Sequence, residues 1–187
     1  YSKMVGDFVN DAKKEVQNAH DWSALRSVVT VSTSSGTSEY SITGSKEDPK
    51  IISAINDTQN LFLTYQTPVW MDNAYFNTDA PSGAPDTYTF NGIDSNGDVK
   101  IKLYPTPDAT YSLRFNLVIR PAELSANTDE VTIPYLPIVH QTIALLARER
   151  GETGGTSSYF AIANKYLSDA IAHDAYQHPE EFTYNVV

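Results

Sequence analysis

The sequence of 187 residues contains no cysteine. This absence excludes disulfide bonds, a thiolate nucleophile and any zinc or iron–sulfur site that needs cysteine ligands. Long hydrophobic runs are missing as well: no stretch approaches the roughly 20 apolar residues of a membrane-spanning helix, and none resembles the core of a signal peptide. We therefore expect no membrane partner.

Basic residues are scarce, because 13 Lys and Arg stand against 23 Asp and Glu and give a formal net charge of −10. Proteins that grip nucleic acid gain most of their affinity by neutralising phosphates, so they are normally basic. The charge argues against a DNA-binding protein, although it suits a conduit through which DNA slides without sticking. A solvated acidic surface with no special role would explain the charge equally well.

The sequence also lacks an arrangement of residues that indicates an active site. The segment Asp94–Asp98 has its glycine at the fourth position of the loop and Pro105 at the twelfth, which favours a β-turn over a calcium loop. The four histidines include no pair at helical i, i+4 spacing, and Gly151–Gly155 lacks the Lys-Ser/Thr of a phosphate loop. We expect no catalytic residue, no metal and no cofactor, and hence no enzyme.

Hydrophobic periodicity predicts an α+β fold. Apolar residues recur at spacings of three and four in 5–19, 136–150 and 159–176, which predicts one helix near the start and two near the end. The glycine-rich linker between the last two predicts an antiparallel helix pair. Between them lie alternating β-branched segments, interrupted by a short helix that Thr67 can cap with Pro68 at its first position.

The alternating segments also suggest how the strands pair. We expect one hairpin from 28–32 and 40–43, and another from 51–55 and 61–65. Segments 99–103 and 111–119 each have one apolar face, so antiparallel pairing through 105–110 is the natural expectation. The Asn96-Gly97 pair indicates a further hairpin turn.

This pattern predicts a helical domain formed by residues 1–26 and 133–178, with an antiparallel β-rich domain inserted at 27–132. Residues 179–187 should form an extended C-terminal arm, because Pro179 ends the last helix and apolar residues then alternate with period two.

Both closing helices are apolar over more than one stripe, which favours contacts with neighbouring subunits. On the first of them, Leu136, Val139, Ile143, Leu146 and Ala147 mark one face, and Ile138 and Leu145 lie off it. The residues that we predict at subunit interfaces are Phe8, Val16, Ile138, Leu145, Phe160 and Tyr166. The arm offers Phe182, Tyr184 and Val186 as candidates for docking on a portal protein; a disordered terminus is the alternative.

The two flanking helical segments resemble those of head-to-tail adaptor proteins of tailed bacteriophages. The resemblance rests on Asn10-Asp11-Ala12…Glu15…Ala19-His20-Asp21-Trp22…Leu25, on Ile133-Pro134…His140…Ala144…Ala147…Arg150-Gly151-Glu152, and on Tyr159-Phe160…Ala163…Tyr166. It covers essentially the whole chain, and its motifs are structural rather than catalytic.

The resemblance implies a virion protein at the head–tail junction, assembled in the host cytoplasm. Such adaptors form a homo-oligomeric ring, usually of about twelve subunits, in keeping with closed rotational symmetry. The ring joins the portal protein above to a tail tube or nozzle protein below, and DNA passes through it without specific binding.

Two other classes remain open. The 12 tyrosines and 2 tryptophans would also suit a β-rich carbohydrate-binding or receptor-binding module. An accessory domain of an enzyme, or a hydrolase of unknown type, would need a polar cluster in a pocket.

Overall fold

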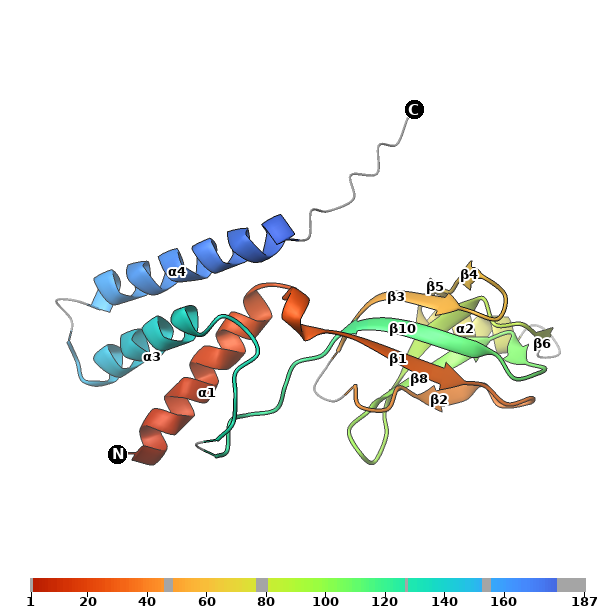
Figure 1. Cartoon of the computed structure of the whole chain (residues 1–187). Coiled ribbons are helices and arrows are strands. Elements are labelled where there is room, and N and C mark those ends of the chain that lie inside the picture. The colour runs from red at the N-terminus through yellow and green to blue at the C-terminus, as the bar shows by residue number, and fades with distance from the viewer. Residues whose placement is uncertain (1, 46–48, 77–80, 127, 153–155, 178–187) are drawn as a thin grey trace. The chain divides into compact units, whose positions relative to one another are not determined.

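The computed structural model divides the chain into two compact units, one formed by Tyr1–Leu25 with Pro121–Val187 and the other by Arg26–Arg120 (Figure 1). It describes residues 2–45, 49–76, 81–126, 128–152 and 156–177. The predicted α+β class is confirmed: helices from the two ends of the chain pack together, and the strands come from the middle of the sequence.

The helical unit contains α1 (Ser2–Ala19), the short 3₁₀ helix η1 (Ser23–Leu25), α3 (Tyr135–Glu149) and α4 (Thr156–Gln177). Helix α3 packs against both α1 and α4, and α4 runs back along α3 as an antiparallel partner (Figure 1). The fully buried Trp22 closes this core at the end of α1, where its indole nitrogen donates to the carbonyl oxygen of Val16 over 2.8 Å.

The segment after the β unit returns along α1. The side chain of Lys13 is 3% exposed, and its ammonium donates to the carbonyl oxygens of Pro121 and Ala122. Asn10 donates to and accepts from the backbone of Leu124 at 3.0 and 2.8 Å. Residues 121–132, which the sequence analysis assigned to the inserted domain, thus begin with a stretch that is bonded to α1.

The β unit holds two four-stranded sheets, with orders β1-β10-β3-β4 and β2-β8-β7-β5. The first sheet contains β1 (Arg26–Ser32), β3 (Lys50–Asn56), β4 (Leu61–Phe62) and β10 (Ser112–Val118). The second contains β2 (Glu39–Ser41), β5 (Thr64–Tyr65), β7 (Thr87–Ile93) and β8 (Val99–Tyr104). A small parallel pair, β6 (Ser82–Gly83) with β9 (Thr106–Pro107), and helix α2 (Pro68–Phe76) complete the unit.

The two sheets enclose a common core. Alternate residues of β10 (Leu113, Phe115 and Leu117) are fully buried and form one cluster with residues of the opposite sheet such as Ile101 and Leu103. The ring of Phe115 meets that of Tyr88 edge to face, with 5.9 Å between centroids. Strand alternation therefore places one apolar face of each sheet inward, as in a β-sandwich.

Two of the expected strand pairings are wrong. Segments 99–103 and 111–119 do not form a hairpin, because β8 pairs with β7 and β2 whereas β10 pairs with β1 and β3. The segments 28–32 and 40–43 are likewise divided between the two sheets. The Asn96-Gly97 turn is confirmed, because it joins the antiparallel β7 and β8. The hairpin expected from 51–55 and 61–65 is confirmed only in part: β4 pairs with β3, whereas β5 pairs in parallel with β7 of the other sheet. The hydroxyl of Thr67 caps α2 by accepting from the backbone nitrogen of Trp70 at 3.3 Å.

Candidate interaction surfaces

Three of the six residues predicted at subunit interfaces lie inside the helical unit. Val16, Ile138 and Leu145 are exposed by only 2%, 4% and 5%. Because these side chains fill the space among α1, α3 and α4, they stabilise the subunit itself rather than present a surface to a neighbour. On α3, the two residues that the sequence placed off the main apolar face, Ile138 and Leu145, are thus buried, and so is Ala147 from that face.

The other three are half-buried. The ring of Tyr166 stacks on that of His140, with centroids 4.2 Å apart and planes 4° from parallel, so His140 is a packed residue between α3 and α4. The guanidinium of Arg148 lies 5.9 Å from the centroid of the Phe160 ring, which is a cation–π distance. Phe8 lies partly covered on α1.

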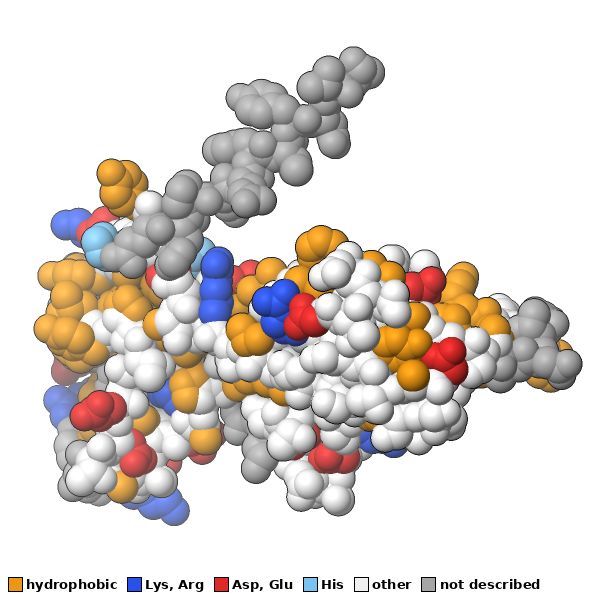
Figure 2. All heavy atoms as spheres, turned by 45° about the vertical axis from the view of Figure 1, so that its right-hand side comes forward, with side chains coloured by type: hydrophobic (Ala, Val, Ile, Leu, Met, Phe, Trp, Pro, Cys, Tyr) orange, Lys and Arg blue, Asp and Glu red, His pale blue; other side chains and the backbone are white. Residues whose placement is uncertain are grey.

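The exposed apolar surface of α3 is formed by Leu136, Val139 and Ile143, which we call the α3 stripe. Their exposed fractions are 42%, 44% and 40%, and their spacings of three and four place them on one side of the helix. A hollow of about 310 Å³ beside Leu136 is lined by residues of both α3 and α4, including Pro137 and Tyr166. An exposed stripe next to a recess is a surface that a partner side chain could fill. Figure 2 shows hydrophobic side chains at the surface of both units.

The predicted docking residues Phe182, Tyr184 and Val186 lie outside the described residues. The nearest described element is α4, which ends at Gln177.

A polar cluster holds the C-terminal half of α4 to the end of α1. Asp174 accepts hydrogen bonds from the hydroxyl of Ser23 (2.6 Å), from its backbone nitrogen (3.1 Å) and from Nε2 of His20 (3.1 Å). Burial of the carboxyl group raises its pKa, but the bonds from Ser23 and His20 outweigh this and hold the pKa of Asp174 below its ordinary value. The serine is bonded to the carboxylate and not to the imidazole, so this is not the arrangement of a nucleophilic triad.

We predict that Asp174→Asn lowers the free energy of unfolding by about 1–2 kcal/mol at pH 7, because a charged acceptor of three hydrogen bonds is lost. A carboxyl whose pKa is depressed by folding stabilises the protein above its unfolded pKa of about 3.9, and this contribution disappears as the pH falls through the folded pKa. Urea unfolding from pH 7 to pH 3 should therefore show the two proteins converging below about pH 4. The matched control Asp169→Asn removes the same charge from an exposed site on α4. If its loss equals that of Asp174→Asn, the hydrogen bonds contribute nothing specific.

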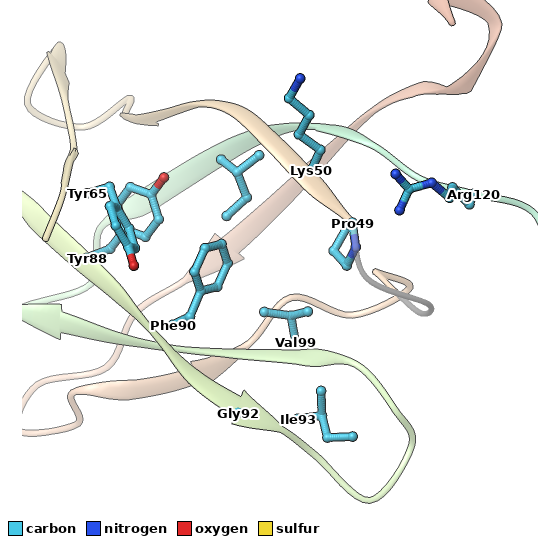
Figure 3. A pocket seen from close by; sticks show the side chains of 10 residues that line it. Pro49, Lys50, Tyr65, Tyr88, Phe90, Gly92, Ile93, Val99 and Arg120 are labelled. Atoms are coloured by element: carbon cyan, nitrogen blue, oxygen red, sulfur yellow. The ribbon is translucent and has the colours of Figure 1, made fainter. Parts of the chain in front are cut away.

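A second candidate surface is a groove in the β unit, which we call the sandwich groove (Figure 3). It has a volume of about 720 Å³, and residues of β3, β5, β7 and β8 line it together with Arg120. Tyr65 and Tyr88 lie at one end, Phe90 lies midway, and Pro49 and Arg120 lie toward the other end (Figure 3). Most of the lining is apolar, and Lys50 and Arg120 contribute the positive charge.

The aromatic residues of the groove contact one another. The ring of Tyr65 lies 5.7 Å from that of Tyr88 and 5.6 Å from that of Phe90, between centroids. Burial, with a smaller effect of Tyr65, raises the pKa of Tyr88, so this phenol stays neutral at physiological pH. Phe90 and Ile93 are nevertheless 38% and 69% exposed. This surface was not predicted from the sequence, in which the run of aromatic residues was its only signal.

No group of three or more His, Asp or Glu side chains that could hold a metal ion occurs in the part of the chain that the structure describes. Within the same residues, no helix has both the length and the apolar character needed to cross a membrane.

The fold and its surfaces define a class: a two-unit α+β protein, with a helical unit that leaves an apolar stripe exposed and a β-sandwich that leaves a groove open. The family model of the SU10 adaptor protein matches residues 1–181. The chain therefore belongs to the SU10 adaptor protein family, a family of bacteriophage structural proteins that contact other components of the virion. A comparison with curated proteins finds no match.

Proposed function

We propose that this adaptor forms a closed homo-oligomeric ring, of about twelve subunits as in the adaptors that it resembles, at the head–tail junction of the virion. In this proposal the ring joins the portal protein to the tail tube or nozzle protein and continues the channel for DNA. It assembles in the host cytoplasm and performs no reaction.

The observation that supports the ring most strongly is the α3 stripe. The helical unit has already buried Val16, Ile138 and Leu145 in its own core, and it still exposes Leu136, Val139 and Ile143. A ring requires a heterologous contact, in which one face of a subunit meets a different face of the next. The stripe and the adjacent hollow between α3 and α4 supply one such face.

The net charge of −10 supports the channel function. A wall that repelled phosphates would let DNA slide, whereas a basic wall would hold it. A continuous belt of Lys and Arg around the bore of the ring would contradict this part of the proposal.

We predict that the double variant Val139→Glu, Ile143→Glu folds normally and fails to form rings. Glutamates at exposed positions cost little in the monomer, but in a packed seam they would be desolvated without partners. Native mass spectrometry of the full chain, alone and mixed with portal protein, measures the assembly. The control Asn18→Glu adds a negative charge to an exposed position of α1 and should still give rings. Rings formed by the double variant would place the seam elsewhere.

The alternative function is a carbohydrate-binding or receptor-binding module. Trp22 cannot serve as a sugar platform, because it is fully buried in the helical core. Saturable binding of a glycan to a monomer that forms no ring would favour this alternative.

A further inference from the structure

The sandwich groove is open because neither sheet is complete on that side (Figure 3). Strand β4 pairs only with Ile55 and Asn56 of β3, and β5 pairs only with Thr87 and Tyr88 of β7. Among the described strands, none lies beside the first residues of β3 or the last residues of β7 on this side. The apolar side chains of those strands, including Phe90 and Ile93, are left facing the groove.

We infer that this groove receives the segment Glu180–Val187 of a neighbouring copy of the chain. The inference rests on the proposed ring, because the ring is what brings a second copy close. In this inference the segment binds to another subunit of the ring, instead of docking on the portal protein as the sequence had suggested.

The first argument is the pattern of the segment. Phe182, Tyr184 and Val186 alternate with polar residues, so an extended backbone would place all three on one edge. Extended peptides with one apolar edge bind where a sheet lacks a strand, with their backbone adding to the sheet and alternate side chains entering pockets. The groove offers both the incomplete sheets and an apolar lining.

The second argument is charge. Glu180 and Glu181 precede the apolar positions, and Lys50 and Arg120 contribute the positive charge of the groove. With the acidic pair toward Arg120, Val186 comes toward the end formed by Tyr65 (Figure 3). A segment in this orientation runs antiparallel to β7, the direction in which tight strand pairs commonly form.

The third argument is reach. Helix α4 ends at Gln177, and residues 178–187 follow it. An extended stretch of this length spans roughly 30 Å, so the segment can bind well away from the helix that carries it. If the segment of each subunit binds in the groove of the next, two different surfaces meet, and this heterologous contact is compatible with a closed ring.

The test measures binding of a labelled peptide, Glu180–Val187, to the full-length chain by fluorescence anisotropy. The acceptor carries Phe182→Ser, Tyr184→Ser and Val186→Ser, so that its own segment does not compete. We expect saturable binding, and we expect Phe90→Glu or Ile93→Glu in the acceptor to weaken it about tenfold or more, because each places a charge in the apolar lining.

Two matched controls distinguish binding in the groove from non-specific binding of the peptide. Phe62→Glu and Val28→Glu alter side chains of β4 and β1 that are exposed by 72% and 60% and do not line the groove, so they should leave binding unchanged. A peptide with the same composition and a scrambled order should not bind.

A charge exchange tests the orientation. The peptide with Glu180→Lys and Glu181→Lys should bind several-fold more weakly, and Lys50→Glu in the acceptor should restore part of the loss. Lys50 is an exposed residue at the start of β3.

Absence of peptide binding, or equal binding by the Phe90→Glu and wild-type grooves, would overturn the inference. A chain that forms rings but binds no peptide would refute only the groove as acceptor. A chain that binds the peptide and forms no ring would support the pairing of groove and segment and refute the ring.

Discussion

Replacing Leu145 by glutamate is expected to unfold the helical unit, with a loss of at least 3–5 kcal/mol, by analogy with roughly that cost for emptying a core site. Leu145 is 5% exposed on the side of α3 that faces the core. The carboxylate would have to be buried without a partner, or the helices would have to separate. The sequence alone placed Leu145 in a subunit seam, where the same substitution would have left the monomer intact.

The comparison with Ile143→Glu distinguishes these two roles. Ile143 lies two positions away on the same helix and is 40% exposed. Circular dichroism with urea unfolding should show the loss for Leu145→Glu, a near-normal transition for Ile143→Glu and a small effect for the volume-conserving Leu145→Met. A folded monomer of Leu145→Glu would refute the assignment of this side of α3 to the core.

Replacing Phe115 by alanine is expected to destabilise the β unit by about 3–5 kcal/mol. Phe115 is fully buried on β10, which lies between β1 and β3, and its ring contacts that of Tyr88 in the opposite sheet. The substitution removes a contact that joins the two sheets and leaves a cavity at the centre of the sandwich.

Phe62→Ala is the matched control, because Phe62 is a phenylalanine of the same sheet that is 72% exposed. Hydrogen exchange followed by mass spectrometry reports the two units separately through their peptides. Loss of protection should spread through the strands of 26–120 in Phe115→Ala and should be minor in Phe62→Ala. Similar protection in both variants would show that Phe115 does not support the sheets.

Local signals in the sequence predicted local structure well. The apolar period of α1, the hydroxyl of Thr67 and the Asn96-Gly97 pair each act within a few residues, and the structure shows the helix, the cap and the hairpin that they indicate. Such features are set by neighbouring backbone and side-chain groups, so the sequence is sufficient to predict them.

Strand partners were harder to predict, because alternation fixes which side of a strand is buried and not which strand covers it. Strands β8 and β10 alternate in the same way, and this pattern suits neighbours in one sheet as well as strands that face each other across a core. The structure has the second arrangement, since Leu103 and Leu113 belong to one cluster although their strands lie in different sheets.

The face of α3 could not be read from the helix itself, because apolar residues surround much of it. Which side is buried depends on α1 and α4, and α1 buries Lys13 and Gln17 beside Ala12 and Val16. The sandwich groove could not be predicted from the sequence either, because its lining residues come from separate strands that are brought together only in the folded protein.

The most direct test of the adaptor account is electron cryomicroscopy of the full chain bound to its portal protein. The account predicts a closed ring beneath the portal, with Leu136, Val139 and Ile143 of each subunit buried against the next. A complex in which single copies bind the portal without touching one another, or a ring that leaves these three side chains in solvent, would contradict it.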